Sequence, residues 1–300
     1  MGAEVSGLYP VAIPERVTRV AIDTPHGYLA ALDAWPADSV PFQGTAVLVP
    51  GFGGSKEDFI PMLTPIVAAG YRALCYDQRG QYESTGPADV RAYSMKLFAE
   101  DLQIVTAAVA AGQPVHLLGH SFGGLVARRV VITAPKAVRS LTLLDSGPDG
   151  ASLSQARLLR LARWLIRVGG PRPVAAATCW AARRAGAPAE RLPWLRHRLL
   201  STSPASLIGV CRAMAREPDL TGSLSCAALP ILVACGEGDN AWAVDTQIEM
   251  GRRLGARITV IEGAAHTPNE DRTEATADML VRFWAAVDHN SRARIAGGPF

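Results

Sequence analysis

Hydrophobic and polar residues alternate along positions 16–23, a period of two that is typical of strands with one buried face. Residues 28–35 follow a Pro-His-Gly turn, which predicts that they form the hairpin partner of this strand. Further along the chain, mostly apolar runs predict strands that are covered on both faces. These runs lie at residues 45–49, 71–76, 115–118, 138–144, 229–235 and 257–261.

Between these runs, apolar residues recur every three or four positions, which indicates amphipathic helices. The predicted helices lie at residues 55–69, 89–111, 122–133, 244–254 and 269–288. Strands and helices that alternate in this way predict an α/β fold. We expect a mostly parallel, helix-covered sheet of about eight strands, with the antiparallel hairpin at its start.

Residues 149–225 break this alternation, because the segment has no convincing strand pattern and is rich in arginine and proline. We interpret it as a helical cap, or lid, inserted above the carboxyl ends of the strands, where open α/β sheets place their sites. The α/β core then comprises residues 1–148 and 226–288. We expect the tail, residues 289–300, to be frayed.

The composition is that of a globular protein with a sizeable core, since 49 % of the 300 residues are hydrophobic and 19 % are charged. A net charge of +3 is too small to indicate a nucleic-acid partner. The five cysteines are scattered and odd in number, which argues against a disulfide framework or a zinc site. No apolar run is long enough to span a bilayer. We therefore expect a cytoplasmic protein without a stable membrane anchor, and the sequence is compatible with a homodimer.

Residues 119–123 read Gly-His-Ser-Phe-Gly and stand between an apolar run and a helical pattern. A serine between glycines at this spacing suits a sharp strand-to-helix turn, which leaves its hydroxyl exposed at the end of the strand. A side chain at Gly119 or Gly123 would clash in so tight a turn. The pattern predicts that Ser121 is a nucleophile.

A serine hydroxyl needs a base to take its proton and an acid to orient that base. Of the six histidines, His266 follows the last predicted strand, and a loop in that place can reach the serine. Asp239 follows the strand before it and fits the order serine, acid, histidine. Asp145, at the end of another strand, is a rival for the role of the acid, and Glu237 is a weaker rival.

Acyl transfer also needs hydrogen-bond donors where the carbonyl oxygen becomes negative. The backbone N–H of Phe122, directly after the nucleophile, is one candidate. The other is the N–H of Phe52, in the loop that follows the run 45–49.

Taken together, these motifs resemble the α/β-hydrolase superfamily, and more narrowly its lidded bacterial members, which include carboxylesterases, lipases, thioesterases and carbon–carbon hydrolases. The resemblance covers about residues 16–148 and 226–288. It implies that Ser121, Asp239 and His266 form a catalytic triad, that Phe52 and Phe122 form the oxyanion hole, and that the insertion roofs the pocket. The motifs that carry it are Gly-Phe-Gly-Gly-Ser at 51–55, Tyr-Asp-Gln-Arg-Gly at 76–80, the serine elbow, Gly236-x-x-Asp239 and Gly263-x-x-His266.

Two positions depart from that pattern. The family often has His-Gly before the oxyanion residue, whereas this chain has Pro50 and Gly51. Proline donates no backbone hydrogen bond, so the loop must be braced in another way or be looser. The loop after Gly80 also differs from the family's usual continuation. We interpret Asp77 and Arg79 as a structural pair and not as catalytic residues.

The resemblance implies a serine hydrolase that cleaves a carboxylic ester or thioester through an acyl-enzyme, without a metal or an organic cofactor. Its expected partner is a small, largely apolar acyl substrate. Alternatives on the same fold are an acyltransferase or perhydrolase and a carbon–carbon bond hydrolase. An alternative of another class is a non-catalytic ligand-binding or sensor protein.

Arg157, Arg160, Arg163 and Arg167 fall three or four residues apart, so they share one face of a predicted helix in the insertion. Charged helical faces are usually only solvated, in which case the leucines between the arginines pack on the core. The alternative is that this face binds an anionic head group. The sequence favours the first interpretation.

Overall fold

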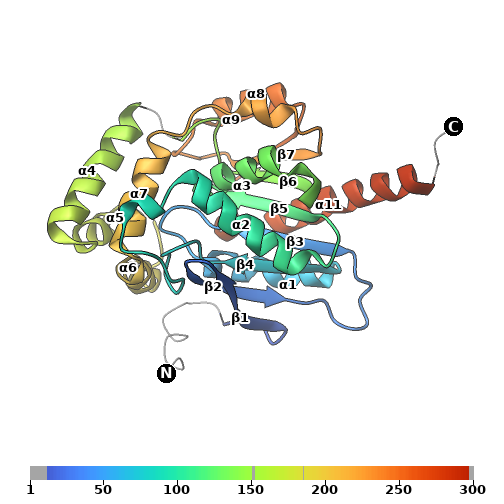
Figure 1. Cartoon of the computed structure of the whole chain (residues 1–300), viewed down its shortest axis with the longest axis horizontal. Helices are drawn as coiled ribbons and strands as arrows, with labels where there is room; N and C mark the ends of the chain where they lie inside the picture. Colours follow the sequence, from blue (N-terminus) through green and yellow to red (C-terminus); the bar gives the residue numbers. More distant parts are fainter. Residues whose placement is uncertain (1–11, 151–152, 185, 297–300) are drawn as a thin grey trace.

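An eight-stranded sheet, in the order β1-β2-β4-β3-β5-β6-β7-β8, forms the centre of the molecule (Figure 1). The computed structural model describes residues 12–150, 153–184 and 186–296. β1 and β2 form the predicted antiparallel hairpin, and β2 also pairs with β4 in antiparallel fashion. The five remaining pairs of neighbouring strands are parallel. The mostly parallel sheet is therefore confirmed. Its strands are β1 (Val17–Thr24), β2 (Gly27–Ala34), β3 (Gly44–Val49), β4 (Tyr71–Tyr76), β5 (Val115–His120), β6 (Val138–Leu144), β7 (Ile231–Gly236) and β8 (Arg257–Ile261).

Helices cover both faces of the sheet. Successive residues of a central strand point to opposite faces, so Val47 and Leu48 of β3 belong to two different hydrophobic cores. The first core lies under α2 (Met95–Ala110), α3 (Phe122–Thr133) and α9 (Val244–Leu254). The second lies under α1 (Ile60–Ala68) and α11 (Thr273–Ala296). This double burial explains why the central strands are mostly apolar.

Three helix boundaries differ from the sequence pattern. The segment before α1 is a short 3-10 turn, η2 (Lys56–Phe59), and a second 3-10 turn, η3 (Val90–Ala92), precedes α2. The Ser94 side chain accepts the N–H of Leu97 and so begins α2 at Met95. The last predicted helix is split into α10 (Pro268–Asp271) and α11.

The prediction of a frayed tail from His289 is wrong over most of its length, because α11 continues to Ala296. Residues 289–296 contain neither proline nor glycine, so nothing in them ends the helix. The helix is also tied to the sheet where the tail begins: the Asp288 carboxylate accepts a hydrogen bond from the Tyr71 hydroxyl at 3.0 Å. Residues 297–300 lie outside the described part of the chain.

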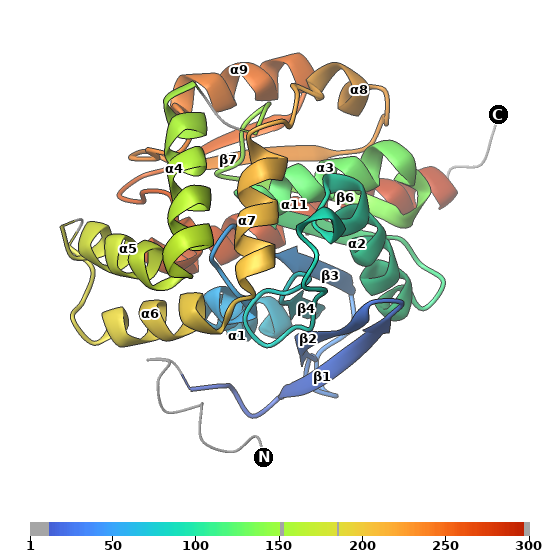
Figure 2. The same ribbon diagram turned by 60° about the vertical axis from the view of Figure 1, so that its left-hand side comes forward.

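Between β6 and β7, the described residues contain helices and no strand. These helices are α4 (Leu153–Gly169), α5 (Arg172–Arg184), α6 (Arg191–Ser201), α7 (Pro204–Met214) and the short α8 (Thr221–Ser225). Figure 2 shows α4, α5 and α6 outside α7, which lies closest to the sheet. No described helix of the protein is long and apolar enough to cross a bilayer.

The insertion is fixed to the loop that follows β4. The backbone N–H of Ser203 donates to the Gly80 carbonyl at 2.8 Å, and the Ser206 hydroxyl donates to the Arg79 carbonyl at 3.1 Å. An ion pair between Arg198 of α6 and Asp58 adds a second attachment to the core. These contacts hold α7 over the carboxyl ends of β3, β4 and β5.

Candidate active site

Ser121 lies at the tip of the turn between β5 and α3. Its backbone is strained, with φ 53° and ψ −120°, a conformation that side-chain-bearing residues rarely adopt. The turn is held by a hydrogen bond from the Ser121 N–H to the Leu144 carbonyl at 2.9 Å. A Cβ at Gly123 would collide with the carbonyl oxygen of Val49. The strand-to-helix turn that the pattern predicts is therefore present, and its glycines are required by close backbone contact.

The structure brings Ser121, His266 and Asp239 into one hydrogen-bonded chain. His266 Nε2 lies 3.0 Å from the Ser121 hydroxyl oxygen, and His266 Nδ1 lies 2.8 Å from Asp239 Oδ1. An ionised carboxylate only accepts hydrogen bonds, so Nδ1 carries the imidazole proton and Nε2 is free to accept the serine proton. This is the geometry that a base-activated serine requires.

Asp239 is held in place and kept charged by its neighbours. Its Oδ1 also accepts the Ala241 N–H at 2.8 Å, and its Oδ2 accepts the Gln247 side-chain amide at 2.6 Å. Burial works to raise the pKa of Asp239, but the hydrogen bond and charge interaction with His266 hold it below its usual value. The side chain is therefore a carboxylate near neutral pH and can stabilise a protonated imidazole.

The two rival acids make different contacts. Asp145 Oδ1 accepts the Gly236 N–H at 2.9 Å, and burial together with the nearby charge of Asp239 raises the pKa of Asp145 to about 9. It is therefore a neutral acid at pH 7. Glu237 accepts the N–H of Gly263 at 3.2 Å on an exposed loop. Neither side chain is hydrogen bonded to His266.

Among the described residues, Asp145, Asp239 and His266 also place their possible metal-binding atoms within 4.8 Å of one another. Both nitrogens of His266 are already engaged, one with Asp239 and one with Ser121. Asp239 and His266 belong to the serine chain, whereas Asp145 Oδ1 accepts the Gly236 N–H.

His120, next to the serine, has a positioning contact that the sequence did not reveal. Its Nε2 lies 2.7 Å from the backbone carbonyl of His266, and because a carbonyl only accepts, Nε2 must carry the proton. Burial and the neighbouring His266 lower the pKa of His120 to about 4, so the ring is neutral. It ties the histidine loop directly to the serine turn.

The loop that holds Phe52 packs directly against the serine turn. A Cβ on Gly51 would lie 3.1 Å from both Ser121 Cβ and His120 Nδ1, so a larger residue would have to push the serine turn away. The N–H of Phe52 has no backbone acceptor among the described residues. Phe122 is the first residue of α3, and its N–H is one of the four that a helix leaves unpaired. Both N–H groups are therefore available to a substrate oxygen.

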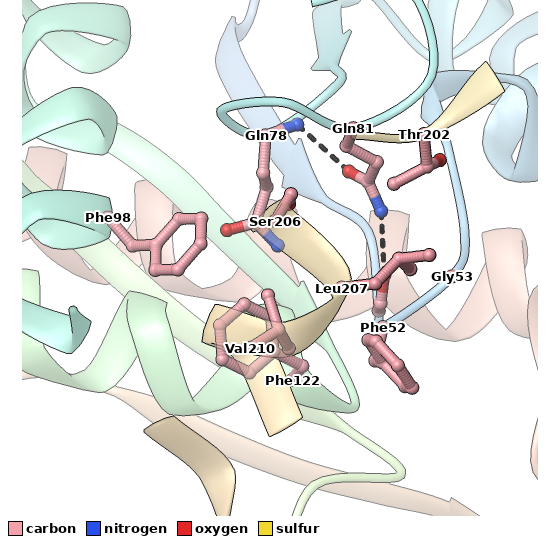
Figure 3. A pocket seen from close by; sticks show the side chains of 11 residues that line it. Phe52, Gly53, Gln78, Gln81, Phe98, Phe122, Thr202, Ser206, Leu207 and Val210 are labelled. Carbon is pink, nitrogen blue, oxygen red and sulfur yellow. Dashed lines mark hydrogen bonds between the residues drawn. The ribbon is translucent and has the colours of Figure 1, made fainter. Parts of the chain in front are cut away.

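Two glutamines from another loop brace the loop that holds Phe52. They do so in a chain that has Pro50 where the family often has a histidine. The Gln78 side-chain amide donates to the Pro50 carbonyl at 2.8 Å, and the Gln81 amide donates to the Gly51 carbonyl at 2.9 Å. Gln81 also accepts the backbone N–H of Gln78 at 2.9 Å, as Figure 3 shows. The sequence predicted that the loop is either braced in another way or looser, and it did not identify these residues.

Replacing Gln81 with methionine is expected to lower kcat. The change keeps the side-chain length but leaves the Gly51 carbonyl and the Gln78 N–H without partners, which costs about 1–3 kcal/mol. We expect kcat to fall about tenfold, because a displaced loop misplaces one oxyanion donor. Ester turnover and melting temperature of Gln81→Met should be compared with those of Gln103→Met, a surface control that loses its bond to Thr133. An unchanged kcat in Gln81→Met would show that the loop needs no brace.

A small cavity lies beside the two candidate oxyanion residues (Figure 3). Its volume is about 10 Å³, which is room for about one small chemical group. The lining is mainly apolar and comes from both the core and the insertion. It includes Phe52, Phe98 and Phe122 from the core and Leu207 and Val210 from α7.

The interpretation of Asp77 and Arg79 as partners of each other is wrong in detail. Arg79 makes a two-point ion pair with Asp101, with bonds of 2.6 and 2.7 Å, whereas Asp77 pairs with Lys56 Nζ at 2.7 Å. Both pairs are buried, so each carboxylate needs a cation close to it. Asp77 also accepts the N–H of Lys56 at 2.8 Å and thereby supports the end of the oxyanion loop.

A helix-covered parallel sheet with a serine, histidine and aspartate at the carboxyl ends of its strands defines an α/β hydrolase. The family model described as "Alpha/beta hydrolase family" matches residues 46–279, and the chain belongs to this family.

Named relatives span several activities. RutD of Variovorax paradoxus (strain S110), named as a candidate carbamate hydrolase, is 31 % identical over 210 residues, which cover 66 % of this chain and 76 % of that protein. The non-heme chloroperoxidase of Streptomyces lividans is 28 % identical over 267 residues, covering 84 % of this chain and 94 % of that protein. The solved structure of an esterase from Thermogutta terrifontis superposes with a TM-score of 0.77 at 23 % identity, covering 90 % of this chain and 99 % of the other. The likeness to that structure concerns the fold.

Proposed function

We propose that this hydrolase cleaves a carboxylic ester or thioester through an acyl-enzyme formed on Ser121. The observation that carries the proposal is the continuous hydrogen-bonded chain from the Ser121 hydroxyl through His266 to the Asp239 carboxylate. A relay of this kind has the parts that covalent acyl transfer needs, namely a nucleophile, a base and a group that orients the base.

In the proposed reaction, His266 Nε2 takes the Ser121 proton while the serine oxygen attacks the substrate carbonyl. The N–H groups of Phe52 and Phe122 bind the oxygen that becomes negative. The protonated His266, stabilised by Asp239, then gives its proton to the leaving alcohol or thiol. A water molecule activated by the same histidine releases the acid and restores the serine.

The hydroxyl nucleophile supports acyl transfer as the first step of the reaction. An acyl-enzyme on Ser121 is an ester, which water can hydrolyse with the help of His266. The carbamate-hydrolase relative acts, by its name, on a carbonyl group that is also bonded to a heteroatom. A carboxylic ester has the same feature, so the name of this relative is compatible with an ester as the substrate class of the relay.

The proposal is tested with p-nitrophenyl acetate, butyrate and octanoate. The small cavity next to Phe52 and Phe122 favours a short acyl group, so we expect acetate or butyrate to give the highest kcat/KM. Sustained turnover together with a mass increase of one acyl group on the peptide that contains Ser121 would support an acyl-enzyme. Stoichiometric binding without turnover would favour a ligand-binding protein instead.

The acyl acceptor is tested in the same assay. Water as the acceptor predicts that the rate of acid release is unchanged by added alcohol or hydrogen peroxide. The chloroperoxidase relative makes peroxide the acceptor to compare. Product formation that rises with peroxide or alcohol, at the expense of the free acid, would identify an acyltransferase or perhydrolase.

A further inference from the structure

Helices α4 and α5 expose large apolar side chains to solvent. Leu158, Leu161 and Trp164 are spaced three residues apart, and Val168 follows four residues later, so all four lie on one side of α4. Trp180 is exposed on the neighbouring helix α5. The members of this group, the exposed apolar set, are each more than half exposed: Leu158, Leu161, Trp164, Val168 and Trp180.

These side chains are not part of the core-facing side of the helix. Ala156 and Ile166 are buried on the side of α4 that packs on α7. The expectation that the leucines of this helix pack on the core is therefore wrong for Leu158 and Leu161, because α4 carries apolar residues on both sides. Apolar surface of this extent on a soluble domain marks an interaction site.

The same segment has the strongest charge bias of the chain. Residues 150–189 contain seven arginines and no aspartate or glutamate, whereas the chain without them has 23 basic and 27 acidic residues, from totals of 30 and 27. The segment is thus strongly positive on a protein that is otherwise slightly negative. The seven residues are Arg157, Arg160, Arg163, Arg167, Arg172, Arg183 and Arg184.

The arginines and the exposed apolar set share one surface. Arg157, Arg160 and Arg167 are exposed on the outer side of α4, between and beside Leu161 and Trp164. On α5, the Arg184 guanidinium lies 5.1 Å from the centre of the Trp180 ring. None of the seven arginines forms an ion pair with a carboxylate of the described residues. The charges of the six exposed arginines, all except Arg163, therefore face solvent without compensation.

We propose that the outer face of α4 and α5 docks reversibly on an anionic lipid bilayer. Arginines attract the lipid phosphates, while tryptophan and aliphatic side chains enter the boundary between head groups and acyl chains, as in interfacial amphipathic helices. A second copy of the chain fits this face poorly, because a symmetric contact would bring the two arginine clusters together. A nucleic acid would leave Leu158, Leu161 and Val168 unpartnered.

An apolar groove extends this face toward the core. Leu158 and Leu159 of α4 form one wall, and Met214 at the end of α7 forms another. Docking through α4 therefore places the apolar surface of the insertion against the lipid, whereas the strands of the sheet stay away from it. The docking surface is separate from Ser121, so vesicle binding and ester turnover can be measured independently.

The test is co-sedimentation of the full chain with vesicles of phosphatidylcholine alone and of phosphatidylcholine mixed with phosphatidylglycerol. We expect binding only to the anionic vesicles, weakened by salt. In a triple variant, Arg157→Gln, Arg160→Gln and Arg167→Gln, each lost charge weakens binding about fivefold, so the total loss is about 100-fold. A double variant, Leu161→Ser with Trp164→Ser, is expected to lose binding as well, while all variants keep wild-type turnover of a soluble ester.

A matched control removes three other exposed arginines, each already paired with a neighbouring carboxylate: Arg91→Gln, Arg252→Gln and Arg282→Gln. It lowers the net charge by the same amount and should bind anionic vesicles as the wild type does. If both triple variants lose the same amount of vesicle binding, net charge alone explains the binding and the proposal is overturned. So would a wild type that ignores anionic vesicles, or a dimer that dissociates in the α4 variants, since a second copy would then cover this face.

Discussion

Ser121→Ala is expected to lower ester turnover by about six orders of magnitude, as loss of a nucleophile does in other serine hydrolases with this relay. The hydroxyl contacts only His266 among the described side chains, so its removal breaks no contact that supports the fold. Alanine meets the same backbone strain at φ 53° as serine does. The folded state should therefore survive, and the loss should appear in kcat and not in the melting temperature.

Ser146, which follows the end of β6, provides a control for this variant. Ser146 is fully buried beside the elbow, and its hydroxyl has no hydrogen-bond partner among the described residues. Ser146→Ala should therefore leave both turnover and melting temperature close to those of the wild type. Turnover of p-nitrophenyl butyrate and thermal unfolding by circular dichroism measure the two effects. Undiminished activity in Ser121→Ala would refute the acyl-enzyme mechanism.

The fold could be predicted from the sequence because local pattern and global burial agree. β3 and β5 are buried on both faces, and such strands can be recognised as continuous apolar runs. The turn at Ser121 could be predicted for a related reason, since only glycine fits at Gly123 against the carbonyl of Val49. A steric requirement that admits one residue type leaves a clear mark in the sequence.

The supports of the site could not be predicted in this way. Gln78 and Gln81 brace the oxyanion loop through side-chain amides that reach backbone carbonyls about thirty positions earlier in the chain. Many polar residues could make such bonds, so the residue type alone does not reveal the partner. For the same reason, Asp77 and Arg79 looked like partners although each binds a different residue. Long-range pairing depends on the fold and not on spacing.

The surface of the insertion shows a further limit of periodicity. A helical period predicts which residues share a side of α4, but it does not say which side another helix covers. Leu161 and Ile166 both fit the pattern, yet Leu161 is exposed and Ile166 is buried under the neighbouring helices. Only the packing of α4 on α7 and α5 decides between them.

The identity of the acid is tested by comparing Asp239→Asn with Asp145→Asn. Asp239 is charged, and asparagine in its place cannot hold the His266 tautomer or stabilise the imidazolium. We expect kcat to fall about 10⁴-fold, as in other enzymes where the same change was made in a serine relay. The asparagine oxygen can still accept the Ala241 N–H, and the side chain keeps the size of the aspartate, so the fold should remain intact.

Asp145→Asn should behave differently because the pKa of about 9 makes Asp145 a neutral acid at pH 7. Asparagine has nearly the same shape as a neutral carboxylic acid, and its oxygen can still accept the Gly236 N–H. Turnover should therefore stay close to that of the wild type. Loss of activity in Asp145→Asn alone would show that Asp145 is the acid and that the assignment of Asp239 is wrong.

The pH dependence of stability separates the two roles further. Because burial raises the pKa of Asp145 in the folded state above its ordinary value of 3.8, the folded protein binds more protons than the unfolded chain between that value and about 9. The free energy of unfolding contributed by this group therefore falls as pH rises through that range. Asp145→Asn removes the titration, so the melting temperature of the variant should fall less between pH 5 and 9 than that of the wild type. If Asp145 only supports the fold, Asp145→Asn shows both the smaller pH dependence of the melting temperature and unchanged turnover. If Asp145 is the acid that orients His266, the variant shows neither of these two results.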